Sequence, residues 1–249
     1  MRPNNEMQQT RRGPVGASLL ISVLDGQREM RTLDKESCAY CGSSAASTED
    51  HVLPSALYPP SKACSGVPRI KVRACLPCNS GWSDDEVHFR NMLLIAGEPN
   101  PAVQELWHGK ARRSSGYSDG RRRLRDLVRQ MVPVHTAAGE RHMVYPGRDE
   151  RVMRIVRKVL RGLCHHHNVP SPVADAQVWG DVQRFDVHPA FLAEMTSAHA
   201  EADILEYRFG VIDDLDTYSS WLLRFSSIEA RTRVEDPAQQ GGAVQSRVR

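Results

Sequence analysis

The chain has 249 residues, of which 40% are hydrophobic, 6% aromatic and 25% charged. A chain of this kind can bury a core as one large or two small domains, so its six cysteines are not needed as a disulfide framework. The net charge of +3, from 33 basic and 30 acidic residues, is too small to indicate a charged partner by itself.

Residues 1–33 are predicted to form a polar, partly disordered leader with one apolar patch at 15–24. The patch follows Arg11 and Arg12, as in a signal peptide, but it is short and runs into polar residues without a small-x-small cleavage site. It is also too short to cross a bilayer. We expect disorder, a strand or a short helix here, in a cytoplasmic protein with no membrane partner.

Two C-x2-C pairs bound the next stretch, residues 34–98. Each such turn can direct two thiolates at one point, and zinc favours four thiolates in tetrahedral geometry. The alternatives are a redox pair, which needs only one pair and a thioredoxin-like βαβ context, and cysteines that are buried by coincidence. The sequence therefore predicts one structural zinc ion, held by Cys38, Cys41, Cys75 and Cys78. Cys64 and Cys164 are expected to be reduced, partly buried thiols.

The sequence Asp50-His51-Val52-Leu53-Pro54 lies between the pairs, and Asn79 directly follows the last cysteine. Over about residues 36–95 this pattern resembles the HNH endonucleases, in the branch whose ββα-metal core is framed by two zinc-binding C-x2-C knuckles. The resemblance implies a metal-dependent endonuclease with a treble-clef-like core. It also implies that His51 is the general base and that Asp50 and Asn79 bind a catalytic divalent ion.

The chemistry of phosphodiester hydrolysis suits these residue types. A neutral imidazole can take a proton from the attacking water. Carboxylate and amide oxygens suit Mg²⁺ or another hard divalent ion, which would neutralise the leaving oxygen. Neighbours on an ideal strand point to opposite faces, so a shared site needs the twisted or bulged hairpin that the resemblance implies. In the structural alternative, Asp50 bonds a backbone amide, His51 caps or packs, and Asn79 closes the turn after Cys78.

One departure from the family pattern lies before the second knuckle, where an asparagine that orients the histidine is replaced by the run Arg69–Ala74. Either another group orients His51, or the site is weaker or inactive. In this run Arg69, Lys71 and Arg73 alternate, so on a strand they share one face. That face could grip a phosphate backbone or could be a solvent-facing edge.

Past the second knuckle, Ser83–Glu86 has the pattern of a capping box that opens a helix. Capping is the expected role of Glu86. The weaker alternative is that Glu86 or His88 faces the metal. Trp82 is expected to be a core residue.

Residues 99–150 are rich in Pro, Gly and Arg, and we expect a long connection with one helix near Arg121–Met131. Eight basic and two acidic residues lie between Lys110 and Arg129. Such a run attracts polyanions, although a solvated arginine-rich loop is the plain alternative. The residues predicted to bind nucleic acid, with DNA as the expected partner, are Arg121, Arg122 and Arg123 together with Arg69, Lys71 and Arg73.

Residues 151–233 are predicted to form a C-terminal α/β region. Apolar residues recur at helical spacing over Arg151–Cys164 opposite a basic face, which predicts an amphipathic helix with its polar face toward DNA. His165–His167 would form its polar end. Strand-like runs follow at Glu206–Ile212 and Ser220–Phe225, and residues 234–249 are expected to be a disordered tail. The region could serve substrate docking, homodimerisation or a protein partner.

The leading hypothesis is therefore an α+β protein in which a zinc-braced HNH-type core hydrolyses nucleic acid with a divalent ion such as Mg²⁺. The first alternative is a zinc-ribbon module that binds nucleic acid without catalysis. The second is an interaction subunit of a larger nucleic-acid defence or repair assembly.

Overall fold

The computed structural model describes residues 18–24, 36–60, 69–96, 100–135, 139, 141–146, 148–169, 171–183, 187–200, 204–211 and 217–225. Helices and strands are mixed along these residues, as expected for an α+β protein. Cys64, the tail at 234–249 and most of the predicted leader lie outside the described residues. Within the described part, none of the helices combines the length and the apolar character that crossing a membrane requires.

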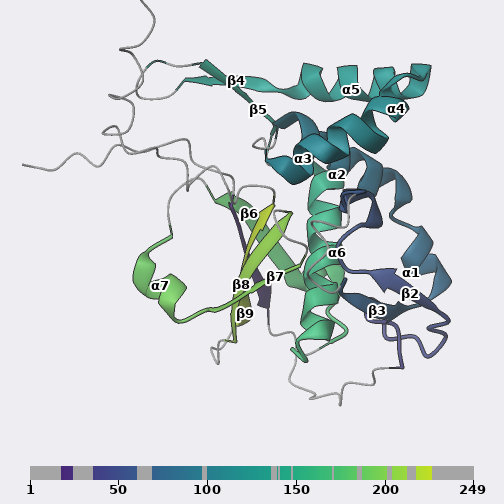
Figure 1. The fold of residues 1–249 in the computed structure, drawn as a ribbon. Coiled ribbons are helices and arrows are strands. Elements are labelled where there is room, and N and C mark those ends of the chain that lie inside the picture. Colours follow the sequence, from purple (N-terminus) through teal and green to yellow (C-terminus); the bar gives the residue numbers. More distant parts are fainter. Residues whose placement is uncertain are drawn as a thin grey trace, which may run out of the picture.

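A five-stranded antiparallel sheet forms one side of the molecule (Figure 1). Its strands have the order β6-β1-β9-β8-β7. They are β1 (Ser18–Leu24), β6 (Val178–Gln183), β7 (Thr196–His199), β8 (Leu205–Val211) and β9 (Thr217–Phe225). The predicted strands at 206–212 and 220–225 thus correspond to β8 and β9. The apolar patch of the predicted leader is β1, which pairs with both β6 and β9 and therefore belongs to the C-terminal sheet.

Helix α6 (Glu150–His166) runs between this sheet and a second, two-stranded hairpin (Figure 1). The hairpin consists of β2 (Thr48–His51) and β3 (Lys71–Ala74), and the short helices η1 (Ser55–Leu57) and α1 (Leu76–Ser80) follow its two strands. Asp149 caps α6, because its carboxylate accepts from the N–H groups of Arg151 at 2.8 Å and Val152 at 3.3 Å. The predicted amphipathic helix is confirmed.

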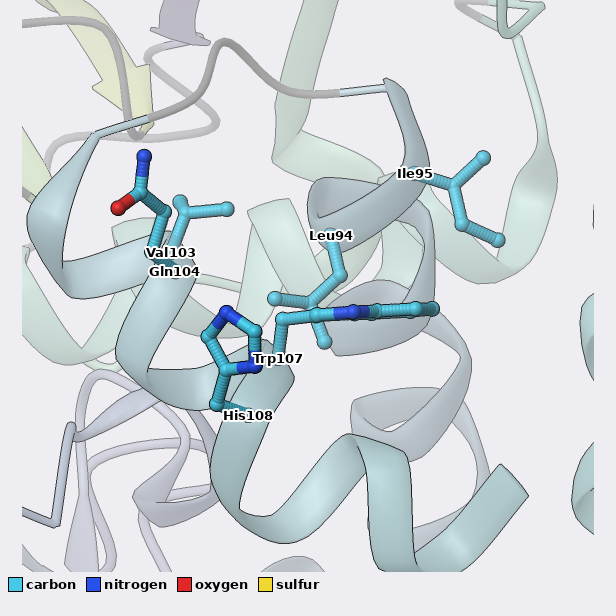
Figure 2. Close-up of a pocket in the computed structure, with 6 residues that line it drawn as sticks. All are labelled: Leu94, Ile95, Val103, Gln104, Trp107 and His108. Atoms are coloured by element: carbon cyan, nitrogen blue, oxygen red, sulfur yellow. The ribbon is translucent and has the colours of Figure 1, made fainter. Parts of the chain in front are cut away.

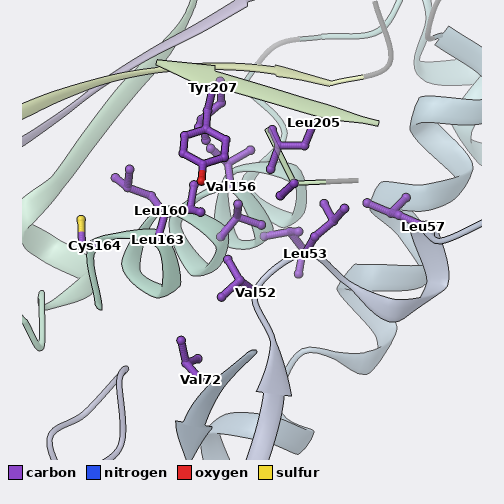
Figure 3. Packing of buried hydrophobic residues seen from close by; sticks show 14 of the residues in the cluster. Val52, Leu53, Leu57, Val72, Val156, Leu160, Leu163, Cys164, Leu205 and Tyr207 are labelled. Atoms are coloured by element: carbon purple, nitrogen blue, oxygen red, sulfur yellow. The ribbon is translucent and has the colours of Figure 1, made fainter. Parts of the chain in front are cut away.

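One continuous core joins the three layers (Figure 3). Val52 and Val72 come from the hairpin, Leu160 from α6 and Leu205 from the sheet, and all of them are buried. Helix and hairpin approach closely at Gly162, where a Cβ atom would lie 2.8 Å from a methyl group of Val52. Gly162 weakens the helix in isolation, but it allows α6 to pack directly on β2.

The basic face of α6 differs from the expectation, because carboxylates of the same chain neutralise it. Arg151 and Arg154 both pair with Asp85, at 2.8 and 2.6 Å. Arg157 pairs with Asp175 at 3.0 Å, and Lys158 is fully buried. Arg151 and Arg154 stay nearly half exposed, but each of these cations has a carboxylate of the chain as its partner, so this face does not present a row of free charges to DNA.

The segment expected to be mostly connection contains several elements. It continues from α2 (Ser83–Ala96) through α3 (Pro101–Leu106), the π-helical turn η3 (Trp107–Ala111), α4 (Arg112–Ser115) and α5 (Ser118–Gln130). A hairpin of β4 (Val132–His135) and β5 (Arg141–Val144) follows. Two short elements, η4 (Asp175–Gln177) and α7 (Pro189–Ala193), complete the chain order. Helix α5 confirms the predicted helix and buries Gly120 and Leu127 beneath an otherwise exposed surface.

The end of α6 is less polar than the three histidines suggested. His165 is buried, with Nδ1 at 3.0 Å from the hydroxyl of Ser171. His167 lies among aromatic rings, with Nε2 at 2.8 Å from the Tyr207 hydroxyl and its ring 4.4 Å from that of Phe209. Burial lowers the pKa of His167 below the usual 6.5, and the charge of His166 lowers it further.

A pH-dependent contribution to stability follows at His167. Because its pKa is lower in the folded than in the unfolded protein, protonation favours unfolding, so this contribution is present above pH 6.5 and is lost as the pH falls through the lowered value. We expect His167→Phe to lose less stability than the wild type between pH 7.5 and pH 5, measured by urea denaturation. His135→Phe, on exposed β4, is the control and should retain the full loss. Equal losses in His167→Phe and the wild type would contradict this assignment.

Candidate zinc-braced site

Four cysteine sulfurs converge where the β2–β3 hairpin meets α1. The Sγ atoms of Cys38, Cys41, Cys75 and Cys78 all lie within 4.8 Å of one another. The Cys41 and Cys75 sulfurs are 3.7 Å apart, close to the edge of about 3.8 Å expected for a tetrahedron with zinc–sulfur bonds of about 2.3 Å. The cluster can therefore hold a metal such as zinc, as predicted.

Local hydrogen bonds hold the two knuckles in place. Gly42 adopts φ +73°, and its N–H donates to the carbonyl of Cys38 at 2.8 Å, which closes the first turn. The Ala39 N–H donates to the Arg73 carbonyl at 2.9 Å and ties this turn to β3. Cys75 directly follows β3 and is the N-cap of α1, so its thiol lies at the start of a helix.

The thiol of Cys38 is already prepared for metal binding. Burial raises its pKa, but hydrogen bonds from the backbone of Cys75, Cys41 and Tyr40 lower it to about 7. Burial and the neighbouring thiols raise the pKa of Cys78 far above its usual value. The Cys38 thiol can therefore ionise near neutral pH, and a bound cation would favour ionisation of the other three thiols.

Asp50 points into the interior and is held by two side chains. It is 6% exposed. The Tyr40 hydroxyl donates to Oδ2 at 2.8 Å, and the Lys158 ammonium lies 2.9 Å from Oδ2 and 3.2 Å from Oδ1. Burial raises the pKa of Tyr40 well above 10, which keeps it a donor. Both oxygens of Asp50 thus already have partners, and the cation beside them is a lysine. The carboxylate does not fit a divalent ion unless Lys158 moves.

His51 lies on the opposite side of the hairpin from Asp50. The pairing of β2 with β3 is regular, with Asp50 opposite buried Val72 and His51 opposite exposed Lys71, so the bulge that would bring the two together is not formed. The His51 ring makes an edge contact with Tyr58, with centroids 5.8 Å apart. Burial lowers the pKa of His51 below 6.5, and the charges of Lys71 and Arg69 lower it further against an opposing effect of Asp50.

Basic side chains share the face on which His51 lies. Strand register places Lys71 opposite His51 and Arg73 opposite Glu49, so the predicted shared face of Lys71 and Arg73 is present. The Arg69 guanidinium stacks 4.2 Å from the ring centre of Tyr58, next to His51. Lys71 pairs with Glu49 at 3.2 Å in an exposed contact. The face thus combines a half-buried imidazole with cations.

Asn79 fastens α1 to β2. Its Nδ2 donates to the Thr48 hydroxyl at 3.0 Å and to the Glu49 carbonyl at 3.3 Å. Within the described residues its Oδ1 accepts no hydrogen bond, so that oxygen is available to a ligand. These contacts give Asn79 a structural role in holding α1 against β2. The sequence pattern allowed either a structural role or metal binding.

Glu86 and His88 belong to two different networks. The Glu86 carboxylate accepts from Lys158 at 2.6 Å, and the Ser83 hydroxyl donates to the Ser80 carbonyl, so the predicted capping box does not form. His88 Nε2 lies 3.1 Å from the Asp149 carboxylate, away from the zinc cluster. Tyr145 donates to the same carboxylate at 2.5 Å.

Lys158 is the residue at this site that sequence reasoning missed. It sits at the border of the apolar stripe of α6, three residues after Ile155, and looks like any other basic residue of that helix. A buried carboxylate needs a counter-cation, but only the tertiary structure shows which lysine supplies it.

A separate hollow lies between the end of α2 and α3 (Figure 2). It is lined by Leu94, Ile95, Val103, Gln104, Trp107 and His108. These walls are largely apolar and carry no carboxylate or thiol, so they offer no support for the predicted metal chemistry.

Comparison of the chain with protein-family models, with curated proteins and with solved structures finds no match in any of the three.

Proposed function

We propose that the cysteine-bounded module is an HNH-type endonuclease that hydrolyses phosphodiester bonds in nucleic acid, with DNA as the expected substrate. The observation that carries the proposal is the face of the β2–β3 hairpin on which the half-buried imidazole of His51 lies beside Lys71 and the Tyr58-stacked Arg69. A base next to fixed cations is the arrangement that hydrolysis of a phosphodiester requires.

The proposed roles follow from these positions. His51 takes the proton of the attacking water, and Tyr58 holds its ring from one side. Arg69 and Lys71 bind the phosphate oxygens and stabilise the charge that develops on them. The zinc site holds the hairpin and α1 together and takes no part in the reaction, because four thiolates leave no open position.

A catalytic divalent ion such as Mg²⁺, with Asp50 and Asn79 as ligands, is the part of the resemblance that the geometry supports least. When bound, such an ion would stabilise the leaving oxygen. Asn79 offers an Oδ1 that accepts no hydrogen bond from the described residues, whereas the carboxylate of Asp50 is neutralised by Lys158. The roles of His51, Arg69 and Lys71 do not depend on this ion.

The second candidate is a zinc-braced module that binds nucleic acid without cutting it. The Lys158 contact with Asp50 favours this candidate, because it occupies the carboxylate that would bind a catalytic ion. It predicts salt-sensitive binding with no cleavage in any divalent ion.

Plasmid nicking by zinc-loaded protein separates the two candidates. With Mg²⁺ or Mn²⁺ present, we expect His51→Ala to cut roughly 10²–10⁴-fold more slowly than the wild type, the usual contribution of a general base. His135→Ala, on the exposed strand β4, is the matched control and should cut at the wild-type rate. Equal rates for His51→Ala and the wild type would reject the nuclease assignment, and the absence of cutting in both would favour the binding module.

A further inference from the structure

Arg90 is a buried cation without an acidic partner. Three basic residues are buried among the described residues, Arg90, Lys158 and Arg161, with Arg90 only 7% exposed. Lys158 contacts two carboxylates and Arg161 lies 3.5 Å from that of Asp175. Within the described part of the chain, Arg90 has only Asn91, whose Oδ1 accepts from Nε at 3.2 Å and from Nη2 at 2.9 Å. Burying a charge without a counter-charge is costly, which points to a ligand that is not part of the chain.

One edge of the Arg90 guanidinium remains open. Among the described residues, its Nη1 has no hydrogen-bond partner. This nitrogen is nevertheless not sealed from solvent. The side chain is therefore fixed by Asn91 on one edge and presents its other edge to a ligand. A fixed guanidinium fork favours planar or tetrahedral oxyanions, which accept two hydrogen bonds from it.

A second arginine, Arg123, lies on helix α5, which contacts α2. Helix α5 buries Leu127, whereas Gly120 packs against Ser114 and Ser115 of α4. Arg123 is exposed and lies one helical turn before Leu127, so helical spacing places it next to the buried side of α5. The charge of Arg123, after burial, helps to lower the pKa of Arg90, as expected for two cations held close together.

Three other arginines of α5 have partners within the chain, whereas Arg125, like Arg123, meets no carboxylate among the described residues. Arg121 donates to the Gly116 carbonyl at 2.6 Å, and Arg122 and Arg129 pair with Asp119 and Asp126 within 4 Å. Among the described residues, Arg123 meets no carboxylate. Two arginines on contacting helices that both lack an acid repel one another, and an anion bound by both would remove this repulsion.

We propose that Arg90 and Arg123 form a phosphate-binding site between α2 and α5 that takes a backbone phosphate of a nucleic-acid strand. The strand, rather than a free phosphate, is favoured because α5 carries further exposed arginines over its 13 residues, a length of about 20 Å. This choice of strand rests on the proposed function. The site itself rests on the two arginines.

The test measures binding rather than cutting. Zinc-loaded protein carrying His51→Ala is titrated against a fluorescent oligonucleotide at several salt concentrations. Adding Arg123→Gln should weaken binding about fivefold to tenfold and reduce the salt slope by about one. Arg129→Gln, which removes the same charge from the same helix but breaks a pair with Asp126, should weaken binding less than about threefold. Equal effects of the two variants would overturn the site.

Arg90→Met gives a readout that a structural role would not produce. Because the variant removes an uncompensated buried charge, the melting temperature of the free protein should stay unchanged or rise while oligonucleotide binding weakens. A large fall in melting temperature would instead make Arg90 a structural residue and overturn the proposal.

Inorganic phosphate distinguishes the two sources of the ligand. If millimolar phosphate raises the melting temperature of the wild type but Arg123→Gln leaves oligonucleotide binding intact, the site holds a small phosphate compound and the strand assignment fails. If the protein binds DNA as predicted and never cuts it, the nuclease proposal fails and the phosphate site stands.

Discussion

Replacing Lys158 with methionine is expected to lower the free energy of unfolding by about 3–5 kcal/mol, a large fraction of the stability of a typical domain. Lys158 is 0% exposed and contacts Asp50 and Glu86 together. Methionine fills a similar volume but leaves the two carboxylates without their cation. Urea denaturation at pH 7.5 measures the loss.

Two variants make this prediction specific. Lys71→Met breaks the exposed pair with Glu49 and should cost less than about 1 kcal/mol. Combining Lys158→Met with Asp50→Asn and Glu86→Gln removes the unpaired charges and should recover much of the stability. If Lys158→Met costs no more than Lys71→Met, the network does not hold α6 to the hairpin.

Removing the zinc ligands should have the second large effect. A structural zinc site contributes about 10–16 kcal/mol of apparent binding free energy, which is coupled to folding. We expect one zinc ion per chain, and we expect Cys38→Ser with Cys75→Ser to lose the metal and the fold of the β2–β3 hairpin. Elemental analysis counts the metal, and hydrogen exchange at residues 38–80 reports the fold.

Cys164→Ala is the control for this experiment. Cys164 is a fully buried free thiol in α6 and does not belong to the four-sulfur cluster. The variant creates a small cavity but should keep its zinc. A folded hairpin in the double variant, or zinc loss in Cys164→Ala, would contradict the assignment of the metal to the four converging cysteines.

Local patterns predicted the elements whose signal lies within a few residues. The knuckles, the amphipathic helix α6 and the strands β8 and β9 all follow from spacing that is visible in a short window. The predicted capping box at Ser83–Glu86 did not form, because the Glu86 carboxylate binds the Lys158 ammonium, a stronger partner than a backbone N–H. Lys158 is 72 residues away in the sequence. Short-range patterns carry no information about such a contact.

The site shows the same division between local and distant information. The register of the hairpin puts the basic residues on the face of His51, as alternation predicted. The environment of Asp50 could not be predicted, because its counter-ion is 108 residues away and one among several basic residues of α6. The burial of Arg90 could not be predicted either, because it depends on how α2 packs against elements distant in the sequence.

The position of β1 has a consequence for how the protein is made on the ribosome. This strand precedes its partners β6 and β9, which emerge roughly 160 and 200 residues later, so both of its edges stay unpaired until then. Contacts of such long sequence separation form slowly, and unpaired strands are prone to aggregate. The hairpin with the four converging cysteines has all four thiols within residues 38–78 and can close long before that. Nascent chains should therefore pass through a stage in which the four-cysteine hairpin is folded and the five-stranded sheet is incomplete. A chain truncated before residue 217 would lack β9 and would leave one edge of β1 unpaired.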